Sequence, residues 1–213
     1  MTLSASGTAS VEPGADKSGD LIRHVHTAIA RGCPTVVQVS DERRTLILLR
    51  HAKSDYPDGV ADHDRPLAPR GQREAGLAGD WLRSDSLIDP PVQAVLCSTA
   101  TRTRETLSRT GLNAEVRFVD RLYDASPGAV IDEINGTEDM FGFDARTLLV
   151  IGHEPAMSQL ALGLAGTEGT DAVAAQEIST KYPTSAMAVL RISGTWRALT
   201  LGGAALVAFY VPR

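Results

Sequence analysis

The sequence predicts an α/β protein, a three-layer α/β/α sandwich whose central sheet is mostly parallel. Short apolar runs, each of a length that suits a buried strand, recur along the chain after residue 45. Stretches with helical spacing of apolar residues separate these runs, and such alternation is typical of a layered sheet. Hydrophobic residues make up 43% of the 213-residue chain, which is sufficient for one substantial core.

The chain before this pattern differs in composition. Residues 1–19 are rich in Ser, Gly, Ala and Thr and predict a disordered N-terminal tail. Residues 20–44 predict an extension of unknown role with a short helix, because apolar residues recur at four-residue spacing from Leu21 to Ile29. A single domain without internal repeats is expected over residues 45–213.

The first strand and helix of this domain have clear boundaries. The continuous apolar run 46–49 predicts a strand buried on both faces, and the run stops at Arg50. After a polar loop, a one-sided stripe of Ala, Leu and Trp predicts a helix over 71–84. A second buried strand is expected over 94–97 and ends at Ser98.

The alternation then continues. A helix is expected over 101–109, because Gly111 can end it, and a third strand is expected over 116–119. Pro127 favours the first turn of a short helix over 127–135.

The last third of the domain predicts one more strand–helix pair and three late strands. The pair is a strand over 147–151 and a helix over 157–165, which Gly166 can close. The dipeptide Ser193-Gly194 predicts a hairpin turn between the first two late strands. The late strands are expected at 186–192, 196–201 and 205–210.

Composition argues against several classes of function. A net charge of -5 argues against a broad basic surface, so no nucleic-acid partner is expected. No apolar run approaches the ~20 residues that span a bilayer, and no secretion signal is visible, so no membrane partner is expected. The chain has only 2 cysteines and no zinc-type spacing, which predicts a cytoplasmic location and a buried, apolar Cys97.

Three polar segments each follow a predicted strand directly. They are Arg50-His51, residues 98–102 and residues 152–155, which include Arg102 and His153. Ligands of open α/β sheets bind outside the carboxyl ends of the strands. We therefore expect two arginines and two histidines to meet at one edge of the sheet.

These residue types suit phosphoryl transfer. Arginine offers a planar fork of donors for phosphate oxygens, and histidine can attack phosphorus or hold a phosphate oxygen. Phosphoryl transfer needs mainly positioning and charge stabilisation, so neither a metal nor a cofactor is expected. The cluster Asp62-His63-Asp64 does not predict a metal site, because alternating neighbours on one loop seldom converge.

Three motifs resemble those of a known family, the histidine phosphatase superfamily, also called phosphoglycerate-mutase-like. They are Leu48-Leu49-Arg50-His51-Ala52, the stretch from Ser98 to Thr106, and Gly152-His153-Glu154-Pro155. Further segments are similar to those of the small bacterial phosphohistidine phosphatases. These are Arg50 to Ser54, Asp64-Arg65-Pro66-Leu67, Arg70-Gly71, Leu122 to Ser126 and Thr184-Ser185-Ala186.

The resemblance implies a role for each matching residue and makes 45–213 a histidine phosphatase domain. His51 would be the nucleophile that becomes phosphohistidine. Arg50, Arg102 and His153 would bind the phosphoryl oxygens. Gly71 lies near the position where the family often holds the nucleophilic ring through a backbone contact.

The general acid is less clearly marked. Asp124 matches by position the carboxylate that many family members use to protonate the leaving oxygen, and Asp55 and Asp64 are weaker candidates. A phosphoramidate leaves as imidazole and needs less help. Ser98 and Thr101 are expected to be turn and cap residues.

Three functions remain open on the sequence. The first is a phosphatase that acts on protein phosphohistidine, and the second is a phosphatase for small phosphorylated metabolites. Both use the same pocket, and short connections between the motifs leave that pocket open. The third is a phosphate-binding regulatory protein without turnover.

Overall fold

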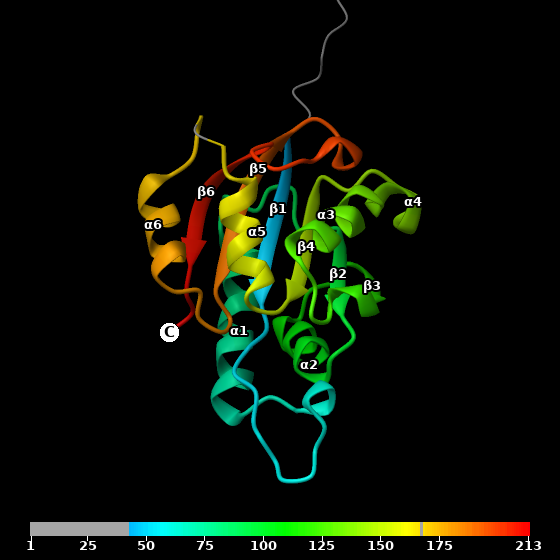
Figure 1. Cartoon of the computed structure of the whole chain (residues 1–213), viewed down its shortest axis with the longest axis vertical. Helices are drawn as coiled ribbons and strands as arrows, with labels where there is room; N and C mark the ends of the chain where they lie inside the picture. The colour runs from blue at the N-terminus through cyan, green and yellow to red at the C-terminus, as the bar shows by residue number, and fades with distance from the viewer. Residues whose placement is uncertain (1–42, 167) are drawn as a thin grey trace, which may run out of the picture. The chain divides into compact units, whose positions relative to one another are not determined.

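The computed structural model describes residues 43–166 and 168–213, and one six-stranded sheet organises them (Figure 1). The tail expected at 1–19 and the helix expected within 20–44 lie outside the described residues. The strand order is β3-β2-β4-β1-β5-β6. The strands are β1 (Arg43–Arg50), β2 (Ala94–Ser98), β3 (Glu115–Val119), β4 (Thr147–Gly152), β5 (Met187–Ser193) and β6 (Ala204–Tyr210).

The sheet is mostly parallel, as predicted. Strands β1 to β4 pair in parallel, whereas β5 pairs antiparallel with both β1 and β6. The helices are α1 (Pro69–Ser84), α2 (Thr101–Thr110), α3 (Pro127–Asn135), α4 (Thr137–Phe141), α5 (Ala156–Leu164) and α6 (Ala172–Thr180). Three short 3-10 turns complete the set: η1 (Asp62–Asp64), η2 (Asp120–Leu122) and η3 (Trp196–Ala198).

Helices cover both faces of the sheet, which confirms the α/β/α class. Helices α1 and α2 pack on one core, and α3 to α6 pack on the other. Alternate residues of β1 divide between these cores: Leu46 and Leu48 face one, and Ile47 and Leu49 face the other, each 0% exposed. Burial of such a side chain contributes roughly 1.5–3 kcal/mol, which explains why the central strands are apolar without alternation.

The predicted strand over 196–201 is wrong, and so is the hairpin across Ser193-Gly194. The chain forms η3 instead, and β5 pairs with β6. Trp196 is the physical reason, because its ring is fully buried and its Nε1 donates a hydrogen bond to the carbonyl of Ala145 at 2.7 Å. This anchor draws the segment into the core and away from the edge of β5.

Helices α4 and α6 were not predicted from the sequence. Helix α6 begins at a capping residue, Asp171, whose side chain accepts hydrogen bonds from the backbone N–H groups of Val173 and Ala174. Only Ala174 and Ile178 are buried along this helix, so its apolar stripe is narrow and easily overlooked. No helix within the described residues is long and apolar enough to cross a membrane.

The topology brings three strand ends together. In the parallel registers, Arg50 at the end of β1 lies opposite Gly152 at the end of β4, and Cys97 of β2 lies opposite Ile151. Cys97 is fully buried, as predicted, and burial raises the pKa of its thiol to about 12. The residues that follow these three strands therefore share one edge of the sheet.

Candidate active site

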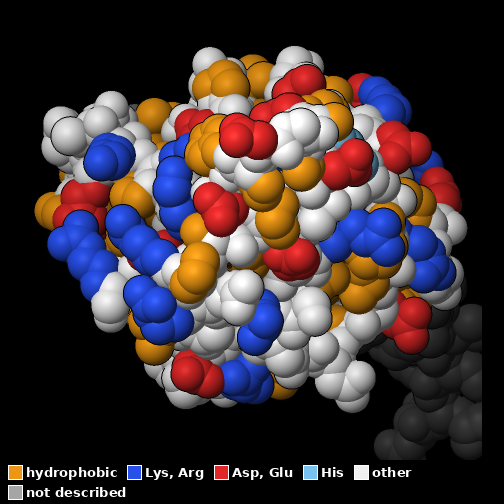
Figure 2. Space-filling view, turned by 90° about the horizontal axis from the view of Figure 1, so that it is seen from below, with side chains coloured by type: hydrophobic (Ala, Val, Ile, Leu, Met, Phe, Trp, Pro, Cys, Tyr) orange, Lys and Arg blue, Asp and Glu red, His pale blue; other side chains and the backbone are white. Residues whose placement is uncertain are grey.

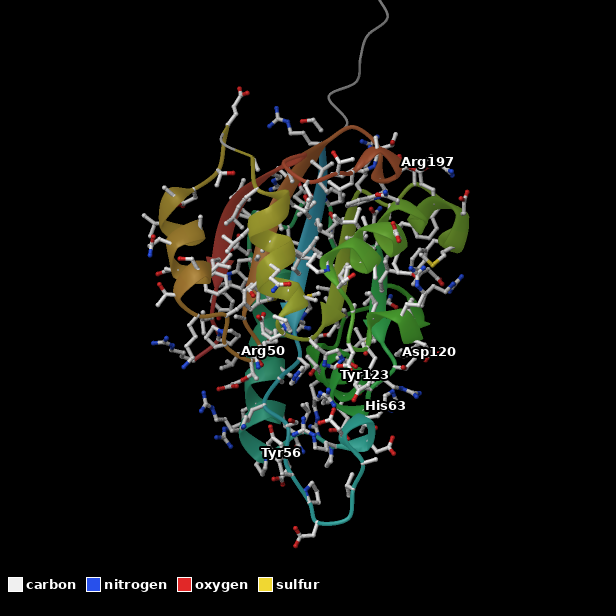
Figure 3. All side chains as sticks on the ribbon, viewed as in Figure 1. Arg50, Tyr56, His63, Asp120, Tyr123 and Arg197 are labelled. Atoms are coloured by element: carbon white, nitrogen blue, oxygen red, sulfur yellow. The ribbon has the colours of Figure 1, made fainter. Side chains whose placement is uncertain are left out.

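The four predicted site residues Arg50, His51, Arg102 and His153 line one cavity of about 200 Å³ at this edge, and Asp124 lines it as well. Arg50 ends β1, Arg102 lies in the first turn of α2, and His153 follows β4. Figure 3 shows Arg50 at this end of the sheet, far from Arg197 at the opposite end. Viewed onto this end, Figure 2 shows basic and acidic side chains interspersed, so the cationic groups of the cavity do not extend into one broad basic face.

The His51 ring is held by the carbonyl of Ala52. Its Nδ1 lies 2.7 Å from that oxygen, which can only accept, so the bond places the proton on Nδ1 and leaves the Nε2 lone pair free. Ala52 is itself fixed, because its N–H donates to Thr106 Oγ1 of α2 at 2.9 Å. Gly71, expected near this ring, packs on Lys53 instead: a Cβ there would lie 2.1 Å from the Lys53 carbonyl oxygen.

His51 is electrostatically suited to remain neutral. Its side chain is buried, and burial lowers its pKa to about 4 against the opposing hydrogen bond to Ala52. The charges of Arg102, Arg50 and Arg65 contribute to this lowering of the pKa. At neutral pH the ring therefore presents an unprotonated Nε2 inside a cationic cavity.

His153 stands beside His51, with the ring centroids 5.1 Å apart. Its Nε2 lies 2.9 Å from Ser98 Oγ, and its Nδ1 has no hydrogen-bond partner within the described residues. Burial, followed by the charges of His51 and Arg102, lowers its pKa to about 3. Ser98, expected as a turn residue, thus orients a ring of the site. Thr101 begins α2, but the cap residue is Ala100 and no side chain caps the helix.

Arg50 and Arg102 each have one buried nitrogen, Nε, without a hydrogen-bond partner among the described residues. Arg50 Nη1 donates to the carbonyl of Tyr182 at 2.6 Å, and Arg102 Nη1 donates to the carbonyl of Asp62 at 2.6 Å. The Nε atoms of Arg50 and Arg102 are buried and have no hydrogen-bond partner within the described part of the chain. Buried donors of this kind are costly unless a ligand satisfies them.

Asp62 holds two arginines that line the cavity, Arg65 and Arg102, a role that was not predicted from the sequence. Its carboxylate accepts hydrogen bonds from Tyr123 Oη at 2.7 Å and Arg102 Nη2 at 3.2 Å. Arg65 Nε forms an ion pair with the same carboxylate at 2.9 Å. The Tyr123 hydroxyl, followed by the charges of Arg102 and Arg65, lowers the pKa of Asp62.

Further residues of the cavity come from the loop between β1 and α1. Lys53, Tyr56 and Arg65 line it, so two cations join the pair that the sequence predicted. The guanidinium carbon of Arg65 lies 3.9 Å from the ring centroid of Tyr56, in cation–π contact. The sequence contained a signal for Arg65. The segment Asp64-Arg65-Pro66-Leu67 is similar to that of the small bacterial phosphohistidine phosphatases, but the resemblance assigned no role to Arg65.

The three candidate general acids, Asp55, Asp64 and Asp124, differ in their position relative to the cavity. Asp124 is exposed at the cavity with a backbone φ of 51°, in the left-handed region that Asp tolerates better than most residues. Asp55 and Asp64 are not among the residues that line the cavity. Asp124 is therefore the one carboxylate of these three that can reach a substrate there.

The described residues offer no metal centre. Within 43–166 and 168–213, no group of three or more His, Cys, Asp or Glu side chains could hold a metal ion. His63 instead contacts Asp64 Oδ1 at 3.3 Å and Thr99 Oγ1 at 3.1 Å. The cavity combines the cations Arg50, Lys53, Arg65 and Arg102 with two imidazole nitrogens that have no hydrogen-bond partner among the described residues, His51 Nε2 and His153 Nδ1.

Known proteins share this sequence pattern and fold. A sequence profile of the histidine phosphatase superfamily (branch 1) matches residues 46–136. An uncharacterized protein of Mycobacterium tuberculosis is 60% identical over 165 residues, which cover 78% of this chain and 100% of that protein. The structure of the putative phosphohistidine phosphatase SixA from Nakamurella multipartitia is 38% identical, with a TM-score of 0.70 over 80% of this chain and 96% of that one. The putative SixA from Agrobacterium tumefaciens is 23% identical, with a TM-score of 0.62 over 79% and 99%, and shares the fold.

Proposed function

Because the chain belongs to the histidine phosphatase superfamily, we propose that it hydrolyses protein phosphohistidine through a phosphorylated His51. The observation that carries this proposal is the geometry of the His51 ring, whose Nδ1 is held by the carbonyl of Ala52 while its Nε2 has no hydrogen-bond partner among the described residues of a cationic cavity. The 38% identity to a putative phosphohistidine phosphatase supports the choice of substrate.

The reaction proceeds in two displacements at phosphorus. In the first, His51 Nε2 attacks, its new P–N bond forms, and the P–N bond to the substrate ring breaks. The departing ring keeps the electron pair and takes up a proton from solvent or Asp124. In the second, a water oxygen attacks phosphorus, the bond to His51 breaks, and inorganic phosphate leaves.

The cavity supplies the charge stabilisation for both steps. The free Nε donors of Arg50 and Arg102 can satisfy phosphoryl oxygens. The Ser98 hydroxyl can donate to His153 Nε2, which leaves a proton on Nδ1 as a third donor. These four side chains give the reaction its positioning and charge without a step that requires a metal.

A second candidate is hydrolysis of small phosphate monoesters. Asp124 favours it, because a carboxylate beside the cavity can protonate an alkoxide leaving group, which an imidazole does not need. The two candidates share every residue that contacts the phosphoryl group, so the choice of substrate must separate them.

Parallel turnover assays test the proposal. Release of phosphate from a phosphohistidine protein is measured beside p-nitrophenyl phosphate and a panel of metabolite phosphates, with His51→Ala as the control. We expect fast, His51-dependent release from phosphohistidine and slow ester cleavage, with the His51→Ala protein folded and inactive. Fast ester cleavage alone would select the second candidate, and no turnover of any substrate would indicate a phosphate-binding protein.

A further inference from the structure

We call the cavity of about 200 Å³ that contains His51 the phosphate cavity, and a second hollow adjoins it. Its volume is about 380 Å³, and it shares Asp124, His153 and Glu154 with the cavity. We call it the side hollow. Its other lining residues are Ala125, Ser126, Pro127, Pro155, Ala156 and Gln159. If the phosphoryl group of a substrate lies against His51, the rest of the substrate can occupy the side hollow.

The two hollows share the carboxylates of Asp124 and Glu154 but differ in their cations, so the net charge of the lining is positive in the phosphate cavity and negative in the side hollow. The phosphate cavity is lined by four cations, Arg50, Lys53, Arg65 and Arg102. Among the described residues that line the side hollow there is no Lys or Arg, and its two charged side chains are the carboxylates of Asp124 and Glu154. The cations that would screen a second anion therefore all lie on the phosphoryl side.

The two carboxylates differ in how they are held. Glu154 accepts hydrogen bonds from Ser158 at its N–H (3.1 Å) and its Oγ (2.6 Å), which fixes this carboxylate at the start of α5. Asp124 makes no hydrogen bond or ion pair within the described residues, so its carboxylate is available to a ligand. His153, 6% exposed, adds an unpartnered Nδ1 to the same wall.

We propose that the side hollow receives the leaving group and selects substrates in which this group is neutral or cationic. The inference rests on the proposed function and narrows it. The imidazole of phosphohistidine fits, because its second ring nitrogen can donate to Asp124 and neighbouring basic residues can approach Glu154. Bisphosphates, phosphoglycerates and nucleoside polyphosphates place a second anion against these carboxylates and are disfavoured.

Binding measurements test the selection without turnover. Two peptides carry the same stable phosphonate analogue of phosphohistidine, one with lysines and one with aspartates on either side. Titration calorimetry with the wild-type protein should give a dissociation constant at least about tenfold lower for the lysine peptide, a ratio that shrinks with added salt. Equal affinity, or tighter binding of the aspartate peptide, would overturn the inference.

A matched pair of variants locates the effect. Gln159 lines the side hollow but not the phosphate cavity, and it is exposed. Gln159→Lys should reduce the ratio of the two dissociation constants severalfold, whereas Gln159→Met, of similar length, should preserve it. If the ratio of the two dissociation constants is unchanged in Gln159→Lys, the side hollow does not select the leaving group by charge, and the inference is contradicted.

Turnover separates the two proposals. If the wild-type protein prefers the lysine peptide but releases no phosphate from the corresponding phosphohistidine peptide, the catalytic proposal fails while the charge selection stands. If it hydrolyses both phosphohistidine peptides through His51 with equal kcat/KM and equal affinity, the catalytic proposal stands and the selection fails.

Discussion

Arg102 is bound twice by Asp62, once by the backbone carbonyl at 2.6 Å and once by the carboxylate at 3.2 Å. The first contact positions the guanidinium, and the second neutralises it. Of the two contacts, only the carboxylate carries a negative charge that would oppose an incoming phosphoryl group. A substitution of the Asp62 side chain therefore changes the charge beside Arg102 but keeps the backbone contact that positions its guanidinium.

Asp62→Asn should strengthen binding of inorganic phosphate. The amide is isosteric and leaves the carbonyl contact to Arg102 in place, but it removes the negative charge that opposes an anion. We expect the inhibition constant of phosphate to fall by up to about tenfold, or about 1.4 kcal/mol. Asp64→Asn, on the same turn without a contact to Arg102, is the control. Weaker phosphate binding in Asp62→Asn would mean that the carboxylate is needed to hold Arg102.

The free energy of unfolding should fall as the pH drops below the ordinary pKa of histidine. Burial lowers the pKa of His51 to about 4 and that of His153 to about 3, from 6.5. Above 6.5 neither the folded nor the unfolded chain binds these protons, and the stability is fully present. Between 6.5 and about 4 the unfolded chain binds these protons and the folded chain does not, at a cost that reaches about 3 kcal/mol for each ring near pH 4.

Urea unfolding at several pH values checks this dependence. His51→Ala removes one of the two buried rings, so its stability should fall less steeply than that of the wild type over the same interval. Equal slopes for the wild type and His51→Ala would mean that the buried rings do not govern acid stability.

Two glycines of α1 should respond in opposite directions to alanine. A Cβ on Gly71 would lie 2.1 Å from the Lys53 carbonyl oxygen, so Gly71→Ala must push α1 from the loop that carries Tyr56. We expect a loss of about 1–3 kcal/mol in the free energy of unfolding. Gly76 has nothing within 4 Å of its Cβ position, and Gly76→Ala should stabilise the helix by about 0.5–1 kcal/mol. Denaturant titration measures both, and a neutral Gly71→Ala would contradict the close packing.

Chelation should leave turnover unchanged. In the proposed mechanism the arginine side chains of the cavity meet the charge of the phosphoryl group, and no group of described His, Cys, Asp or Glu side chains could hold a metal ion. The assay compares initial rates with and without EDTA on the best substrate. Loss of activity that a divalent cation restores would overturn the metal-independent mechanism.

The sequence predicted the part of the site that the sheet determines. Apolar runs stop at Arg50, Ser98 and Gly152, and parallel strands must end at one edge, so the meeting of their following residues was predictable. The positions of Arg65 and Asp62 were not. They depend on a loop closed by the Ser54–Leu67 bridge and by a hydrogen bond from the Leu67 N–H to Glu105 at 2.7 Å.

The C-terminal part of the fold was harder to predict from the sequence for a similar reason. The segment 196–201 has the composition of a strand, but the buried ring of Trp196 binds a carbonyl from a distant loop. A preference of local sequence is overridden there by one contact between residues far apart in the chain. No periodicity of residues 196–201 contains that information.

Tyr182 gives the site an order of assembly during synthesis. Its carbonyl accepts from Arg50, its hydroxyl accepts from the Ala188 N–H, and β1 lies between β4 and β5. A growing chain that has passed His153 already carries every side chain assigned to the phosphoryl group. It still lacks the segment that holds Arg50 and the strand that flanks β1. The nascent chain should therefore be inert toward phosphate until its last elements have been translated and have docked.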